Sequence, residues 1–103
     1  MGTYNTLHMR LVCPRCAEAV DAEITCHFGD TANLVDLSLG DAYPWRPRQS
    51  PRHGGRPAGG DVDGEGYLEC PLCAKDAFLR VQVRGDIVTG VVPDPDKAGY
   101  IAD

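Results

Sequence analysis

Apolar and polar residues alternate along three stretches of the chain, residues 7–11, 20–28 and 77–84. Such alternation predicts β-strands that bury one face and expose the other to solvent. The residues expected on the buried faces are Leu7, Met9, Leu11, Val20, Ala22, Ile24, Cys26, Phe28, Ala77, Leu79, Val81 and Val83. The protein is therefore predicted to be mainly β.

Turn signals connect these strands into hairpins. The pair Gly85-Asp86, flanked by β-branched residues, predicts a tight turn into a further strand, residues 87–92. Two similar Gly-Asp pairs, at residues 29–30 and 40–41, bracket an apolar run that we interpret as another strand, residues 34–39. The expected architecture is a small antiparallel sheet of hairpins.

Two segments lack this periodicity. Residues 42–66 are rich in Pro, Gly and Arg and predict a long Pro/Gly/Arg-rich loop, and residues 93–103 predict an irregular tail. A chain of 103 residues is near the commonest size of one domain. We therefore expect a single domain, residues 1–103, with the loop inserted between its two halves.

The strongest chemical signal is a pair of C-x-x-C units, at residues 13–16 and 70–73. Five cysteines without an apolar leader segment favour metal or redox chemistry over a disulfide framework, and predict a cytoplasmic protein. Four thiolates are the ligand set of a closed tetrahedral structural zinc site. We therefore predict that one Zn²⁺ binds to Cys13, Cys16, Cys70 and Cys73.

The two Cys-Pro-x-Cys units resemble the knuckles of the zinc-ribbon superfamily, of the type also found in rubredoxin-like proteins. The resemblance covers both knuckles and the strands beside them, and it implies a metal site at two hairpin tips. The chain departs from the usual pattern in two ways. Ala17 and Ala74 stand where many knuckles have Gly, and 53 residues separate Cys16 from Cys70.

Three alternatives to the zinc site remain open at this point. Iron binds to the same four thiolates in rubredoxin-like sites, because ligand softness alone does not select the metal. A Cys-Pro-x-Cys unit before an Ala-rich segment is also compatible with a thioredoxin-like dithiol oxidoreductase. The four cysteines could also be ordinary buried thiols.

Other reactive side chains give weaker signals. Cys26 and His27 are adjacent in a predicted strand, so they point to opposite faces and cannot form a thiol–imidazole pair. We expect Cys26 to be buried as a small apolar residue, and His27 to be solvated. The acidic residues Asp61, Asp63 and Glu65 lack the pattern of a calcium loop and are also expected to be solvated.

The basic part of the loop is the candidate interaction surface. Residues 43–60 contain four Arg and no acidic residue, in a chain of net charge −5. Arg and aromatic side chains suit both protein interfaces and nucleic acids, and the overall acidity favours a protein partner. We expect a non-enzymatic, zinc-stabilised binding or adaptor module that does not act at a membrane, with nucleic-acid binding as the alternative. The predicted contact residues are Trp45, Arg46, Arg48, Arg52 and Arg56.

Overall fold

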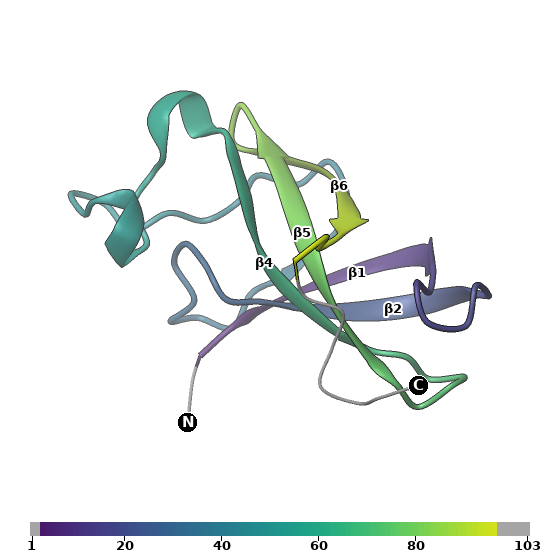
Figure 1. Ribbon diagram of the computed structural model, residues 1–103. Coiled ribbons are helices and arrows are strands. Elements are labelled where there is room, and N and C mark those ends of the chain that lie inside the picture. Colours follow the sequence, from purple (N-terminus) through teal and green to yellow (C-terminus); the bar gives the residue numbers. More distant parts are fainter. Residues whose placement is uncertain (1–2, 97–103) are drawn as a thin grey trace.

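The computed structural model describes residues 3–96, which form one curled six-stranded sheet (Figure 1). The strands are β1 (Asn5–Val12), β2 (Ala19–Cys26), β3 (Asp36–Leu37), β4 (Val62–Glu69), β5 (Asp76–Arg84) and β6 (Ile87–Pro93). Two single-turn 3-10 helices, η1 (Pro51–His53) and η2 (Ala58–Gly60), lie in the connection between β3 and β4. Within residues 3–96, no helix is long and apolar enough to cross a membrane. The mainly β prediction is confirmed.

The sheet is mixed rather than purely antiparallel, which corrects the prediction. Its strand order is β3-β1-β2-β4-β5-β6, and β3 runs parallel to β1 while the other neighbours are antiparallel. A parallel pair needs a long connection instead of a hairpin turn, and residues 13–35, which include β2, supply it. The predicted strand at 34–39 is correspondingly reduced to Asp36–Leu37.

The segment after β3 joins the two edges of the sheet. Gly40 N donates to Val88 O at 2.9 Å, Val88 N donates to Asp41 O at 3.0 Å, and Ala42 forms a bridge with Ile87. After β3, the strand at one edge of the sheet, the chain therefore pairs with β6, the strand at the opposite edge. This pairing turns the curled sheet into a partly closed barrel with one interior.

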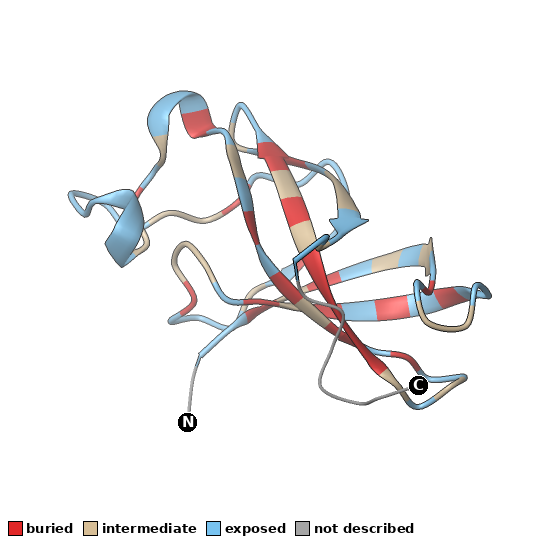
Figure 2. Cartoon of the chain, viewed as in Figure 1, coloured by how far each residue is buried: buried red, intermediate tan, exposed pale blue. Residues whose placement is uncertain are grey.

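The interior is formed by the predicted apolar faces. Figure 2 shows buried residues alternating along β2 and the second half of β5, as expected for strands with one inward face, whereas the first four residues of β5 are all buried. Leu7, Ile24, Cys26, Val81 and Val83 are fully buried. Met9, Leu11 and Phe28 are partly buried and pack against this core. The prediction that Cys26 is a buried apolar residue is thus confirmed, and burial raises the pKa of its thiol to about 12.

β4 begins inside the segment that was predicted to be loop. Residues 42–66 were expected to be irregular, but β4 starts at Val62, so the loop ends at Asp61. The glycines that suggested a loop are inward-facing strand residues. A Cβ on Gly64 would lie 2.2 Å from the Phe28 ring, and one on Gly66 would lie 2.9 Å from Val81. Both positions stay free of a side chain because the core fills that space.

The C-terminal hairpin matches its prediction. Gly85 and Asp86 form the turn between β5 and β6 with φ values of 56° and 69°, the left-handed backbone that a two-residue hairpin turn requires. β6 continues to Pro93, where the irregular tail was expected to begin, and residues 94–96 form a turn. The remainder of the predicted tail, residues 97–103, lies outside the described residues.

Candidate metal centre

The first C-x-x-C unit forms the tip of the β1–β2 hairpin. Its backbone is closed by Ala17 N, which donates to Cys13 O at 2.8 Å, and by Cys13 N, which donates to Glu18 O at 2.9 Å. Inside the turn, Arg15 N donates to Cys13 Sγ at 3.3 Å. The tight turn therefore directs an amide at a sulfur, which stabilises negative charge on it.

The second unit repeats this geometry at the tip of the β4–β5 hairpin. Ala74 N donates to Cys70 O at 3.1 Å, Cys70 N donates to Lys75 O at 2.8 Å, and Leu72 N donates to Cys70 Sγ at 3.4 Å. The sequence offsets are the same as in the first unit. Two copies of one turn thus face each other, and the prediction that the units lie at hairpin tips is confirmed.

Alanine occupies the positive-φ position in both turns. Ala17 has φ of 61° and Ala74 has φ of 59°, in the left-handed region where glycine is usual. Such a conformation costs an alanine about 1–2 kcal/mol. Ala17 and Ala74 therefore adopt the left-handed backbone that glycine usually adopts at this position. Interactions elsewhere in the structure offset the cost.

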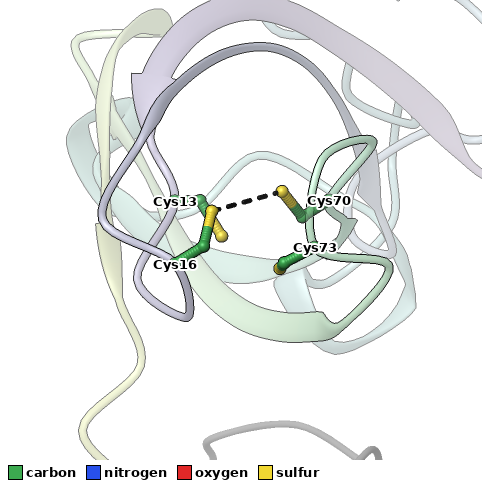
Figure 3. A group of neighbouring side chains, drawn as sticks. All are labelled: Cys13, Cys16, Cys70 and Cys73. Carbon is green, nitrogen blue, oxygen red and sulfur yellow. Dashed lines mark hydrogen bonds between the residues drawn. The ribbon is translucent and has the colours of Figure 1, made fainter.

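The four sulfur atoms converge between the two turns (Figure 3). The Sγ atoms of Cys13, Cys16, Cys70 and Cys73 all lie within 4.8 Å of one another, and Cys16 Sγ is 3.8 Å from Cys70 Sγ. A tetrahedral metal with bonds of about 2.3 Å to sulfur sets sulfur–sulfur distances near ~3.8 Å. The donor set and its spacing therefore fit a metal ion, and all five cysteines of the chain are free of disulfides.

Ionisation of the thiols is unequal. Burial opposes a thiolate at Cys70, but amides of Cys73 and Leu72 and the neighbouring thiols favour it, and the pKa falls to about 7. At Cys16, the backbone at Glu18 favours the thiolate, but desolvation and the other three thiols outweigh it and raise the pKa to about 12. The high pKa of Cys16 means that a bound cation is needed to ionise that thiol near neutral pH.

A buried ion pair links the two turns beside the sulfurs. Arg15 Nη1 donates to Asp76 O at 2.7 Å and lies 3.7 Å from Asp76 Oδ1, with only 8% and 0% of the two side chains exposed. Tyr67 Oη donates to Asp76 Oδ2 at 2.7 Å. Arg15 lies inside the first C-x-x-C unit, whereas Asp76 and Tyr67 were not recognised from the sequence as part of the site. Their only sequence signal is a carboxylate three residues beyond Cys73.

The predicted partner-binding residues lie away from the sulfurs. The loop that carries them and the two Cys turns are at opposite ends of the molecule in Figure 1. Trp45 Nε1 donates to Asp86 Oδ1 at 2.9 Å, and Arg56 donates to both Asp86 oxygens at 2.7 and 3.1 Å. These two side chains therefore fasten the loop to the β5–β6 turn.

The other three arginines are less engaged. Arg46 Nε lies 3.9 Å from Asp30 Oδ1, beyond hydrogen-bond distance. Arg48 and Arg52 are exposed, and their side chains form no ion pair or hydrogen bond with residues 3–96. The structure thus divides the predicted set into side chains that hold the loop and side chains that remain accessible.

The acidic residues near the β5–β6 turn also have structural partners. Asp61 Oδ1 accepts from Gly85 N at 2.8 Å, and Asp63 pairs with Arg84 at 2.8 Å. These contacts hold the end of the loop and the start of β4 against the hairpin. They use carboxylate oxygens that a cation would need.

Comparison with known proteins identifies no relative of this chain. No protein family matches it, and neither a curated protein nor a solved structure is detectably similar to it. The resemblance to zinc ribbons therefore rests on the four-cysteine cluster and its two turns.

Proposed function

We propose that the protein is a non-enzymatic binding module whose fold is held by one Zn²⁺ on Cys13, Cys16, Cys70 and Cys73. The observation that carries this proposal is the convergence of four sulfurs within 4.8 Å from two separate hairpins. Four thiolates complete a tetrahedron around zinc, so no position remains for an activated water or a substrate. A metal centre of this kind stabilises a fold and leaves recognition to another surface.

The surface that best fits recognition is the basic loop. Arg48 and Arg52 are exposed cations without partners among residues 3–96, on a chain of net charge −5. Trp45, Arg56 and the buried Tyr43 hold the loop in place. A positioned basic surface on an acidic body suits an acidic region of a protein partner, because the field is local.

Nucleic-acid binding, the alternative, is less well supported by the same residues. Base stacking on a protein needs an accessible aromatic face. Tyr43 is 3% exposed and stacks on Phe28 with ring centroids 4.3 Å apart, while Trp45 is partly buried against the core. The two loop aromatics therefore serve packing, and the acidic remainder of the chain repels a polyanion.

The first test is metal content combined with thiol accessibility. We expect one zinc per chain and protection of four thiols from alkylation in the native protein. Bound iron would give a coloured protein and support an electron carrier instead. Metal-free protein with a rapidly alkylated thiol would contradict the proposal and favour a dithiol oxidoreductase.

The second test is capture of partners from the native host. The double variant Arg48→Ser/Arg52→Ser removes two loop cations and leaves the Asp86 contacts intact. The matched control Arg10→Ser/Arg80→Ser removes two cations from strands; their pairs with Asp21 and Asp96 are exposed and contribute little, while Arg80 also lies 3.6 Å from the less exposed Asp94, so the melting temperature of this control is measured as well. We expect only the loop variant to lose partners; an unchanged set of partners would contradict the proposed role of the loop.

A further inference from the structure

The loop and the turn after β2 enclose a basic pocket. The cavity has a volume of about 390 Å³, within the range of small-molecule sites. None of its lining residues is Asp or Glu, although the chain contains 15 acidic residues. The polar side chains that line it are Thr3, His27, Thr31, Arg46, Arg52 and His53. Basic and hydroxyl side chains therefore line this pocket, although the protein as a whole is acidic.

The walls of the pocket are fixed by backbone contacts. Arg46 N donates to Gly54 O at 2.7 Å, and Asp30 N donates to Pro44 O at 3.0 Å. Gly54 has φ of 90°, and a Cβ there would lie 2.6 Å from Gly29 O, so the loop touches the turn after β2 closely. Both sides of the pocket are therefore positioned before any ligand arrives, which lowers the entropy cost of binding.

The side chains in the pocket are donors with spare capacity. The Arg52 side chain has no partner among residues 3–96. Arg46 has only the distant Asp30 carboxylate at 3.9 Å, and Asp30 Oδ1 also accepts from Ala32 N at 3.1 Å. An imidazole offers an N–H donor in either protonation state, so His27 and His53 add two more donors. The missing counterpart is an anion with several acceptor oxygens.

We propose that this pocket binds a phosphate monoester carried by a side chain of a protein partner. The inference rests on the proposed function of the loop and specifies its ligand. A phosphorylated side chain carries a charge of about −1.5 to −2 and three terminal acceptor oxygens. The Thr3 and Thr31 hydroxyls hydrogen-bond to each other at 2.7 Å, which leaves one hydroxyl donor for a ligand. Two guanidinium groups with the imidazole donors and this hydroxyl match a phosphate better than they match a carboxylate, which has two oxygens and one charge.

The source of the phosphate is argued from charge and shape. A single dianion experiences mainly the field inside the pocket, whereas a nucleic acid extends its charges over the surrounding acidic surface. The adjoining aromatic residues Tyr43 and Trp45 are occupied in packing, so they offer no platform for a base. A phosphorylated protein segment therefore fits this site better than a nucleic acid.

The test is an NMR titration of the full-length, zinc-loaded protein with the peptide Gly-Gly-phosphoserine-Gly-Gly. We expect saturable shifts of backbone amides near His27, Arg46 and Arg52, and a weaker response to inorganic phosphate. The unphosphorylated peptide and its Glu-containing analogue should bind at least tenfold more weakly, because they present fewer charge-assisted acceptors.

Variants separate the pocket from general charge. Arg52→Gln and Arg46→Gln should each weaken peptide binding about tenfold or more. Arg48→Gln removes the same charge from the same loop outside the pocket lining, and it should change the affinity by less than about twofold. Unchanged melting temperatures would show that these exposed replacements keep the fold.

Three results of the titrations would overturn the inference. They are the absence of saturable shifts, an equal loss of affinity in Arg48→Gln, and tighter binding of an oligonucleotide that lacks terminal phosphates. Phosphatase treatment of the partner gives a further test. If it does not reduce loop-dependent capture, the phosphate-binding inference is rejected while the proposed function of the loop is retained. Capture independent of the loop would instead reject the proposed function itself.

Discussion

Asp86 connects the basic loop to the β5–β6 turn, two parts of the chain that are distant in sequence. Its carboxylate accepts from Trp45 and Arg56, and its backbone N–H donates to Gly60 O at 3.0 Å. The hydrogen bond from Arg56 is the main cause that holds the pKa of Asp86 below its ordinary value of 3.8. Because a depressed pKa stabilises the folded state above the unfolded-state value, this contribution is present at neutral pH and is lost on acidification.

The direction of this pKa shift determines the expected pH dependence. As the pH falls below 3.8, protonation of Asp86 should release Trp45 and Arg56. Fluorescence of Trp45, the one tryptophan in the chain, measures the release. Asp86→Asn keeps a residue that tolerates the left-handed backbone and should remove the part of the fluorescence change that depends on Asp86, whereas the exposed Asp36→Asn should retain that part. Circular dichroism of the same samples separates this part from the unfolding caused by acid release of the metal. An unaltered transition in Asp86→Asn would contradict the assignment.

Arg15 is the counter-ion of the buried Asp76 carboxylate beside the sulfurs. Its guanidinium pairs with Asp76, whose side chain is fully buried. Removal of one partner from such a pair leaves the other charge without compensation, at a cost of about 3–5 kcal/mol. The neighbouring strand offers a contrasting pair, Arg10 and Asp21, whose side chains are 66% and 86% exposed.

We therefore expect Arg15→Met to lower the free energy of unfolding by about 3 kcal/mol or more. Arg10→Met should lower it by less than about 1 kcal/mol, because its pair is solvated. Urea denaturation of the zinc-loaded variants measures both values. The double variant Arg15→Met/Asp76→Asn should recover part of the loss, and no recovery would argue that Arg15 acts through packing alone.

At the scale of elements, β4 shows why its start was mistaken for loop. Gly64, Gly66 and Leu68 alternate as buried positions with exposed Asp63 and Glu65, which is a regular strand pattern. Glycine does not register as apolar, so the pattern was not recognised from sequence. The space is filled instead by the Phe28 ring, which lies two residues beyond the end of β2.

Replacement of Gly64 tests this packing. Gly64→Ala places a methyl group 2.2 Å from the Phe28 ring and should destabilise the fold by about 1–3 kcal/mol. Gly90→Ala in β6 is the matched control, since its nearest atom is Gln82 Oε1 at 3.5 Å, and it should be neutral within about 0.5 kcal/mol. Thermal unfolding compares the two, and equal stability would exclude the proposed close approach.

The elements that sequence predicted well are those defined by local signals. The faces of β2 and β5, the Gly85-Asp86 turn and both Cys turns each depend on residues a few positions apart. The parallel β1–β3 pair, the bridge from Ala42 to Ile87 and the contacts of Asp86 depend on chain segments that meet only in the fold. Hydrophobic periodicity carries no information about which distant segments will contact each other, so these contacts could not be predicted.

At the scale of the whole molecule, the four-cysteine cluster joins the two halves of the sheet. Each half contributes one hairpin and two cysteines, and the hairpins also meet through the short pairing of β2 residues 24–26 with β4 and through the Arg15–Asp76 ion pair. Structural zinc contributes apparent binding free energies of about 10–16 kcal/mol in zinc-finger peptides, comparable with the stability of an entire domain.

Removal of the metal should therefore unfold the protein. We expect a strong chelator, or Cys13→Ser, to abolish the cooperative thermal transition, as measured by circular dichroism. Cys26→Ala should keep one metal per chain and a cooperative transition, although it leaves a small cavity in the core. A sharp transition in fully chelated protein would show that the metal is not required for the fold.

The position of the basic loop between the two Cys pairs has a consequence for a severed chain. A protease that cuts between Arg48 and Arg52 would leave one fragment with β1, β2 and β3 and another with β4, β5 and β6. Each fragment would retain two of the four sulfur ligands, so the nicked molecule would stay assembled until its metal was withdrawn. With the proposed zinc as the link, the protein is a candidate for a split reporter whose two pieces recombine when zinc is supplied.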